Sequence, residues 1–228
     1  MLVQPEPENC FEGSQDWRCS RARQSAKTTF YQFAGKRILD VACASAGLLL
    51  LAPCFLIVAA LVKFTSAGPV LFCQARVGRN GRIFFVMKFR SMQEHSRIGS
   101  LVTVAGDSRI TLVGSILRKY KIDELPQVWN VLRGEMSLVG PRPEVEQYVI
   151  DYTDQQRRVL RVRPGITDPA SIAYRHEEGL LSSQSNPQQY YRNVLLPHKL
   201  SLNLEYVENI SFRRDASLIL NTLRSIFS

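Results

Sequence analysis

Residues 36–63, KRILDVACASAGLLLLAPCFLIVAALVK, decide how this chain is organised. Within this stretch, residues 41–62 form a run of 22 residues without a charge. A helix of roughly 20 apolar residues crosses the hydrocarbon core of a bilayer. A cleavable signal peptide has a shorter apolar core and lies closer to the N-terminus. A buried core helix is the ordinary alternative, but a helix that is apolar on all sides over this length is less typical of one. The stretch therefore predicts a membrane-inserted helix over about residues 38–63.

Pro53 lies near the middle of this stretch. Proline removes an intrahelical hydrogen bond and clashes with the preceding turn, so the helix can break there and return to the membrane face that it entered. Lys36 and Arg37 precede the apolar run and Lys63 follows it, whereas a spanning helix has its Lys and Arg bias on one side. A kinked spanning helix is equally compatible, because membrane helices tolerate proline. These residues leave both geometries open.

The composition restricts the possible partners and argues against disulfide and zinc sites. The chain has 228 residues and a formal charge of +9, so nucleic acid, an acidic membrane surface and a phosphorylated substrate are all compatible partners. Its five cysteines are odd in number and include no C-x-x-C pair, which argues against a disulfide framework or a zinc site. Residues 1–34 are mainly polar and predict a mobile tail before one domain, residues 35–228.

The remaining pattern predicts an α+β fold that is mainly helical. Residues 69–92 contain two runs rich in Val, Phe and Ile, joined by a tight turn at Asn80 and Gly81, and so predict a β-hairpin. Residues 111–120 and 215–227 have apolar residues at helical spacing and predict amphipathic helices.

Two further helices are expected between these amphipathic segments. One is predicted to begin with Asp123 as its N-cap, to carry Pro126 in its first turn and to end before Gly134. The other covers residues 148–162. The stretch SLVGPRPE, residues 137–144, is expected to be a stiff loop because two prolines restrict its backbone.

The stretch KIDELPQ, residues 121–127, places two carboxylates side by side in a strongly basic neighbourhood. A helix cap and a first-turn acid are the ordinary roles of Asp123 and Glu124. The same helix dipole favours a phosphate, and Arg142, held between two prolines, is suited to binding an anion. An ionised aspartate beside a phosphate can act as nucleophile or metal ligand.

Four motifs occur in order along the chain: KFRSM at 88–92, DELPQ at 123–127, SLVGPRP at 137–143 and RPGIT at 163–167. Together with the proline-containing apolar stretch, they resemble the monotopic phosphoglycosyl transferases of the bacterial sugar transferase family, over about residues 35–227. The resemblance implies a membrane enzyme that transfers a sugar 1-phosphate from a nucleotide sugar, usually a UDP-sugar, to polyprenyl (undecaprenyl) phosphate. That reaction is the first membrane step of glycan or exopolysaccharide assembly.

The resemblance also implies roles for particular residues. Asp123 would attack the β-phosphate of the donor, form a covalent aspartyl phosphosugar and release UMP, while also binding Mg²⁺. Glu124 would be its acid/base or metal-positioning partner. The candidate substrate-binding residues are Lys88, Arg90, Arg118, Pro141, Arg142 and Pro143.

The implied membrane geometry is a re-entrant helix broken at Pro53. With interfacial amphipathic helices and membrane lipids around it, the active site would lie on the cytoplasmic face of the bacterial inner membrane. The chain departs from the family pattern at Ala52, where a serine is common, and at residues 168–171, where Asp-Pro-Ala-Ser replaces Gly-Trp-Ala-Gln. The second departure leaves substrate specificity open.

Two other functions compete with this reading. A membrane-bound phosphatase with an aspartate nucleophile would use the same acid pair. A membrane-tethered anion-binding protein would explain the positive charge but not the acid pair. Nucleic acid is not an expected partner, because aromatic and basic residues are not interleaved as in a nucleic-acid-binding motif.

Overall fold

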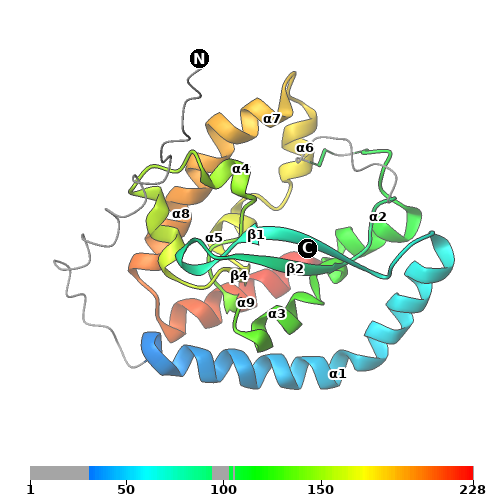
Figure 1. Ribbon diagram of the computed structural model, residues 1–228, viewed down its shortest axis with the longest axis horizontal. Helices are drawn as coiled ribbons and strands as arrows, with labels where there is room; N and C mark the ends of the chain where they lie inside the picture. Colours follow the sequence, from blue (N-terminus) through cyan, green and yellow to red (C-terminus); the bar gives the residue numbers. More distant parts are fainter. Residues whose placement is uncertain (1–30, 94–102, 105, 228) are drawn as a thin grey trace, which may run out of the picture.

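The computed structural model describes residues 31–93, 103–104 and 106–227, so the predicted tail up to residue 30 lies outside the described residues. Residues Tyr31–Gly35 form a π-helical turn that continues into the long helix α1 (Lys36–Thr65). The later elements are β1 (Leu71–Val77), β2 (Ile83–Phe89), α2 (Leu112–Lys119), α3 (Gln127–Arg133), β3 (Ser137–Val139), α4 (Glu146–Val149), β4 (Gly165–Thr167), α5 (Pro169–Ala173), α6 (Glu177–Ser182), α7 (Pro187–Tyr190), α8 (Leu196–Glu208) and α9 (Phe212–Phe227). The mainly helical α+β architecture is confirmed. Figure 1 shows α1 along the bottom, the hairpin across the middle and most other helices above it.

The predicted hairpin is confirmed. Strands β1 and β2 pair antiparallel, with Leu71 opposite Phe89 and Val77 opposite Ile83. The turn between them places Asn80 at φ 58° and Gly81 at φ 76°. These are the two residue types that adopt positive φ most easily, which is why the chain reverses there.

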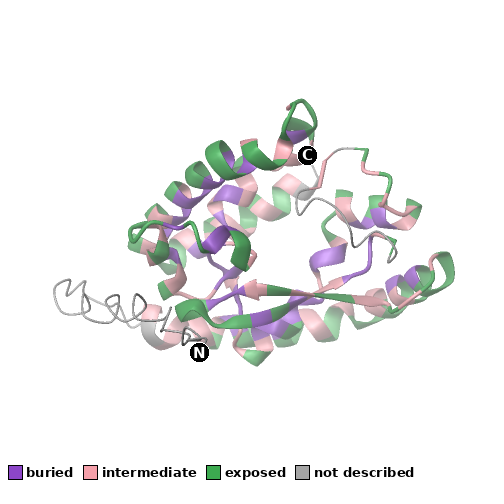
Figure 2. Ribbon diagram, turned by 45° about the horizontal axis from the view of Figure 1, so that its top comes forward, coloured by how far each residue is buried: buried purple, intermediate pink, exposed green. Residues whose placement is uncertain are grey.

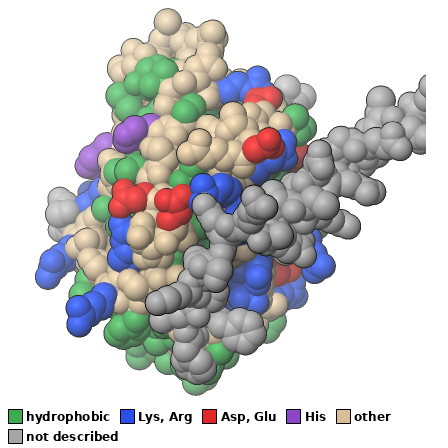
Figure 3. Space-filling model, turned by 90° about the vertical axis from the view of Figure 1, so that its left-hand side faces the viewer, with side chains coloured by type: hydrophobic (Ala, Val, Ile, Leu, Met, Phe, Trp, Pro, Cys, Tyr) green, Lys and Arg blue, Asp and Glu red, His purple; other side chains and the backbone are tan. Residues whose placement is uncertain are grey.

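Helix α1 is unbroken across Pro53, and its ribbon bends upward in its second half (Figure 1). Proline is a recognised cause of such bends. Only 11% of an 18-residue apolar stretch of this helix is buried, whereas the core helix of a soluble protein is mostly buried. Figure 2 colours α1 mainly as intermediate or exposed, and hydrophobic side chains gather at the level of α1 in Figure 3. Membrane association follows from this exposure, while the re-entrant geometry stays a prediction.

The start of α1 is docked on the rest of the domain. Arg37 donates to the carbonyl oxygens of Val131 and Leu132 in the last turn of α3, at 2.6 and 3.0 Å. The buried Asp40 accepts a hydrogen bond from the backbone N–H of Leu138 at 3.0 Å. A residue expected as a basic membrane flank therefore also holds the helix against α3.

A two-stranded parallel sheet of β3 and β4 was not predicted. Gly140 and Gly165 approach so closely that a Cβ on Gly165 would lie 2.1 Å from the Gly140 nitrogen. Backbone hydrogen bonds run from Gly140 to Thr167 and from Gly165 to Pro141, both at 3.0 Å. The pairing fixes the start of the loop that carries Arg142.

The helix expected from Asp123 onward begins later, so the N-cap assignment was wrong. Lys121 adopts a left-handed backbone after α2, and residues Ile122–Glu124 then form a 3-10 turn before α3. Asp123 therefore lies inside a turn, with a buried side chain. The predicted end is confirmed, because Gly134 adopts φ 83° immediately after α3.

The helix predicted over residues 148–162 is divided into α4 and a 3-10 helix, Gln156–Arg161. Thr153 and Gln156 explain the division. The backbone N–H of Thr153 donates to Gln156 Oε1 at 2.9 Å, and that of Gln156 donates to Thr153 Oγ1 at 3.3 Å. This reciprocal pair is a capping box, which starts a new helical segment. The amphipathic helices predicted at residues 111–120 and 215–227 are present as α2 and α9.

Candidate active site

Asp123 and Glu124 lie in the 3-10 turn between α2 and α3. They are 5% and 7% exposed, although each carries a carboxylate. Burial of a charge is costly unless cations or hydrogen-bond donors surround it. The two carboxylates differ in the groups that surround them, and they therefore differ in the chemistry that each can perform.

Glu124 is held by two cations. Lys88 at the end of β2 donates to its Oε1 at 2.8 Å, and Arg142 donates to Oε2 at 3.2 Å and also to Oε1. Burial alone would raise the pKa of Glu124, but the charges of Arg142 and Lys88 outweigh it, so its pKa lies well below the ordinary value. Glu124 is therefore an ionised anchor at neutral pH and a poor proton donor there.

Asp123 keeps an oxygen available. Its Oδ1 is buried and has no hydrogen-bond partner within the described part of the chain. Burial raises the pKa of Asp123, and the neighbouring Glu124 charge raises it further, while Lys88 and Arg118 act in the opposite direction. An unpartnered carboxylate oxygen of this kind suits a nucleophile or a metal ligand.

The fit of Asp123 to Mg²⁺ follows from its free oxygen. The described residues contain no group of three or more His, Cys, Asp or Glu that could hold a metal. Protein-bound Mg²⁺ commonly uses one or two carboxylates and takes its other ligands from water and substrate phosphates. Asp123 alone would therefore suffice as the protein ligand of a Mg²⁺ ion whose other ligands came from water and phosphates.

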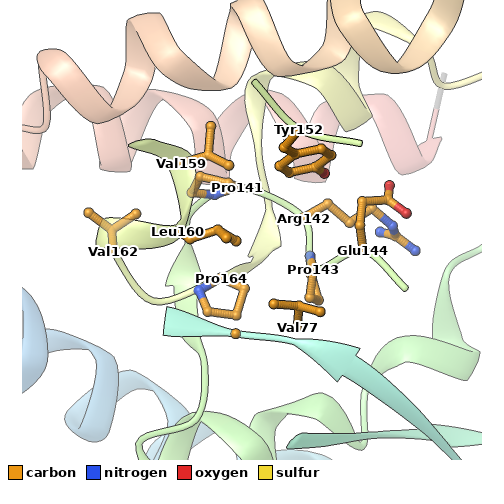
Figure 4. Close-up of a pocket in the computed structure, with 11 residues that line it drawn as sticks. Val77, Pro141, Arg142, Pro143, Glu144, Tyr152, Val159, Leu160, Val162 and Pro164 are labelled. Atoms are coloured by element: carbon orange, nitrogen blue, oxygen red, sulfur yellow. The ribbon is translucent and has the colours of Figure 1, made fainter. Parts of the chain in front are cut away.

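The loop that carries Arg142 is rigidly packed. Figure 4 shows Pro141, Arg142 and Pro143 lining one pocket together with Val77 of β1 and Leu160 of the 3-10 helix. The cavity beside them has a volume of about 10 Å³, which is about the space of one water molecule and far too small for a nucleotide sugar. Pro141 and Pro143 are buried and restrict the backbone on both sides of Arg142, and their substrate-binding role stays a prediction.

Glu144, which the sequence reading did not select, holds the other end of this loop. The hydroxyl of Tyr191 donates to Glu144 Oε1 at 2.6 Å, and Arg76 lies 3.5 Å from Oε2. Arg76 also donates to the carbonyl of Pro143 at 3.2 Å. The sequence feature that could have indicated Glu144 is its position directly after Pro141-Arg142-Pro143.

Arg90 directly follows β2, and its side chain contacts the C-terminal end of α1. It is 5% exposed and donates to the carbonyl oxygens of Val62 at 3.4 Å, Ser66 at 2.7 Å and Pro69. These contacts satisfy carbonyl groups that a helix end leaves free. These contacts give Arg90 a structural role, and the kinetics of an Arg90 variant test the substrate-binding role that was expected of it.

Arg118 lies in the last turn of α2, and its charge lowers the pKa of Asp123 against the larger effect of burial. Its guanidinium donates to Glu178 of α6. The structure therefore brings Lys88 and Arg142 onto Glu124, and keeps Arg118 close to Asp123 but paired with another acid.

Asn130 is a second residue that the sequence reading missed. It is fully buried in α3, donates to the carbonyl of Phe85 at 2.8 Å and accepts from the N–H of Met87 at 3.1 Å. These bonds join α3 to β2 next to Lys88. A polar residue among the apolar positions of the predicted helix was the available signal.

The departure at residues 168–171 forms a capped helix. Asp168 is fully buried and accepts hydrogen bonds from the Ser171 backbone N–H at 3.0 Å and from its hydroxyl at 2.5 Å. Pro169 occupies the first turn of α5, a position that suits proline. The glutamate charge of Glu124 raises the pKa of Arg142 most, and the Asp168 charge adds to it, so this departure lies close enough to influence the site.

Comparison with known proteins places this arrangement among related chains. The family model described as bacterial sugar transferase matches residues 31–228. The exopolysaccharide production protein ExoY of Rhizobium meliloti is 35% identical over 207 residues, which cover 84% of each chain.

Two further relatives carry names that state a reaction. A UDP-glucose:undecaprenyl-phosphate glucose-1-phosphate transferase of Caulobacter vibrioides is 37% identical over 199 residues, covering 85% of this chain and 70% of the relative. A UDP-N-acetylgalactosamine-undecaprenyl-phosphate N-acetylgalactosaminephosphotransferase of Aeromonas hydrophila is 36% identical over 200 residues. That match covers 85% of this chain but 44% of the relative, so this chain spans less than half of the longer protein.

Proposed function

This chain belongs to the bacterial sugar transferase family, and from that premise we propose that it transfers a sugar 1-phosphate from a UDP-sugar to undecaprenyl phosphate. It is an enzyme of the phosphotransferase type, and the names of two relatives state such a reaction for those proteins. The similarity to an exopolysaccharide production protein supports a role in exopolysaccharide assembly.

One observation carries the proposed mechanism: a buried Asp123, with an oxygen that has no partner among the described residues, lies beside a Glu124 that is neutralised by two cations. In the first step, Asp123 Oδ1 forms a bond to the β-phosphorus of the donor. The bond from that phosphorus to the bridging oxygen breaks, and UMP leaves with the electron pair. The product on the enzyme is an aspartyl phosphosugar.

In the second step, a phosphate oxygen of undecaprenyl phosphate attacks the same phosphorus. The bond to Asp123 breaks, which restores the carboxylate and yields undecaprenyl diphosphate sugar. Two steps allow a water-soluble donor and a lipid acceptor to react without being bound at once. The exposed apolar surface of α1 supports a site at the membrane, where each substrate arrives from its own phase.

The cations have a separate task from the nucleophile. Lys88 and Arg142 hold Glu124 ionised and in place, which keeps positive charge beside the attacking oxygen. Mg²⁺ bound by Asp123 and the donor phosphates would supply the neutralisation that lets a carboxylate approach an anionic diphosphate. We place the reaction on the cytoplasmic face of the membrane, where nucleotide sugars occur.

The test uses the full chain in detergent with Mg²⁺ and a panel of UDP-sugars that includes UDP-glucose and UDP-N-acetylgalactosamine. Without acceptor, we expect UMP release of no more than one equivalent per enzyme, together with a protein mass increase of one sugar phosphate. With undecaprenyl phosphate, we expect repeated turnover and a lipid-linked sugar. Release of inorganic phosphate without acceptor would instead identify a phosphatase, and donor binding without UMP release would identify an anion-binding protein.

A further inference from the structure

The four basic residues that were predicted from the sequence to bind substrate all contact other protein groups in this structure. Lys88 and Arg142 contact Glu124, Arg118 contacts Glu178, and Arg90 contacts carbonyl groups at the end of α1. A cation that already faces a carboxylate must share or break that contact to receive a phosphate. A free cation near Asp123 would receive the donor diphosphate more readily.

Lys121 is such a cation. Its side chain is exposed, and it lies two residues before Asp123. Over residues 31–93, 103–104 and 106–227, its ammonium group forms no hydrogen bond and no ion pair. Its charge nevertheless reaches the acid pair. Burial raises the pKa of Asp123, and the charge of Lys121 is one of those that oppose this effect.

The backbone of Lys121 is a second, independent observation. Its φ of 56° and ψ of 20° lie in the left-handed region. The other non-glycine residue with positive φ in the described chain is Asn80, whose side chain tolerates this region. Lys121 occupies the position after the end of α2 that glycine usually fills, and lysine has no comparable local advantage there. Strained backbone of this kind is found preferentially at functional sites.

We propose that Lys121 is a substrate-binding residue, whose ammonium group binds the donor diphosphate as it approaches Asp123. This inference rests on the proposed function, because it assigns a residue to the donor of that reaction. A lysine suits the task, since its ammonium is a compact charge on a flexible stem that can follow a phosphate into the site. Lys121 would thus supply the first cation that the donor meets, before Arg118 is released from Glu178.

The test compares three substitutions at this position with a matched control. Lys121→Gly removes the charge and suits the left-handed backbone, Lys121→Asn removes the charge with a tolerated side chain, and Lys121→Arg keeps the charge. Lys119→Ala removes the same charge from the exposed face of α2, where Lys119 lies over the Tyr120 ring. We expect the KM for the UDP-sugar to rise about tenfold in the glycine and asparagine variants, the size of one charge-assisted hydrogen bond. The arginine variant and the Lys119 control should stay within about twofold of the wild type.

The three variants separate charge from structure. A role of the backbone alone would be retained in Lys121→Gly, whereas a role of the charge would be retained only in Lys121→Arg. An unchanged KM in Lys121→Gly, while the wild type releases UMP, would overturn this inference and leave the proposed function intact. Equal losses in Lys121→Gly and Lys119→Ala would also overturn it, because they would show a general effect of surface charge.

Donor affinity gives a readout that is independent of turnover. In an Asp123→Asn background, titration with UDP-sugar should show about tenfold weaker binding when Lys121→Gly is added. Equal affinity in the two proteins would contradict the inference. Absence of UMP release by the wild type with every donor is a different result, and it would overturn the proposed function.

Discussion

Arg142 donates to both carboxylate oxygens of Glu124, at 3.2 Å between Nη1 and Oε2 and through a second bond from Nη2 to Oε1. The two residues are 18 positions apart, and their contact joins the proline-flanked loop to the turn that carries Asp123. Glu124 is occupied by this contact, whereas Asp123 retains an oxygen without a partner among the described residues. The adjacent acids are therefore unequal, and each can be tested separately.

Asp123→Asn should abolish turnover and leave the protein folded. The amide keeps the size of the side chain but cannot form an acyl phosphate. Because burial raises the pKa of Asp123, its ionised form opposes folding at neutral pH, so the neutral variant should melt at the same temperature as the wild type or higher. UMP release and thermal melting in detergent measure the two effects. Full activity of this variant would exclude Asp123 as nucleophile.

Glu124→Gln should lose most activity and also stability, because Arg142 and Lys88 would face a neutral amide. Breaking a buried pair costs about 3–5 kcal/mol, and partial solvation of both cations should reduce the loss here. The folded pKa of Glu124 is lowered, so its contribution is complete above the unfolded value of about 4.3 and is lost as the pH falls through the folded pKa.

Thermal melting from pH 7 down to pH 3 checks this sign for Glu124. The difference between wild type and Glu124→Gln should be constant near neutral pH and shrink below about pH 4. A difference that grows on acidification would contradict the ion-pair account. Near wild-type turnover in the variant would leave Glu124 as a stabilising residue only.

Arg142→Ala should weaken use of the nucleotide sugar more than loss of a surface charge would. Charge-assisted hydrogen bonds contribute about 1.5–3 kcal/mol, which corresponds to more than tenfold in kcat/KM if Arg142 holds Glu124 and the donor. Arg142→Lys should restore only part of the activity, because an ammonium cannot reproduce two parallel bonds to one carboxylate. A change of less than twofold in Arg142→Ala would remove this residue from the site.

Arg90→Ala should destabilise the protein without a matching rise in KM. The buried guanidinium satisfies carbonyl groups at the end of α1, and its loss should lower the melting temperature by several degrees. Kinetics of the remaining folded protein should give a KM within about twofold of the wild type. A large rise in KM at unchanged stability would show that Arg90 binds substrate, as its place in the KFRSM motif had suggested.

Pro53→Ala tests the membrane geometry. If the proline turns the apolar segment back, residues on both sides of α1 lie in the cytoplasm, which the basic residues at both ends favour. Single cysteines near residues 15 and 185, in a background without the native five, can be labelled with a membrane-impermeant reagent in intact and permeabilised cells. Protection of both sites in intact cells is expected for the parent protein.

The alanine variant should move part of the population toward a spanning helix, because an ordinary helical hydrogen bond is restored at residue 53. Labelling of the site near residue 15 should then appear in intact cells. Labelling of that site already in the parent would indicate a spanning helix. Full protection and full activity of Pro53→Ala would show that another feature determines the bend.

Local sequence was sufficient for elements whose geometry depends on near neighbours. The hairpin followed from alternating apolar residues around Asn80 and Gly81, and the end of α3 from the glycine at position 134. Local sequence was not sufficient where the conformation of a turn depends on tertiary contacts. Lys121 adopts a left-handed backbone, which a lysine at this position does not predict. As a result, Asp123 lies in a buried turn and not at the cap of α3.

The sequence alone determines the apolar segment and places Asp123 next to Glu124, because neither feature depends on packing. The partners of each charge are a property of the folded molecule. Lys88 and Arg90 are two residues apart in one motif, yet one contacts Glu124 and the other the end of α1. A buried charge is stable only beside groups that replace its hydration, and the packing of β2, α1 and the Arg142 loop determines which groups those are.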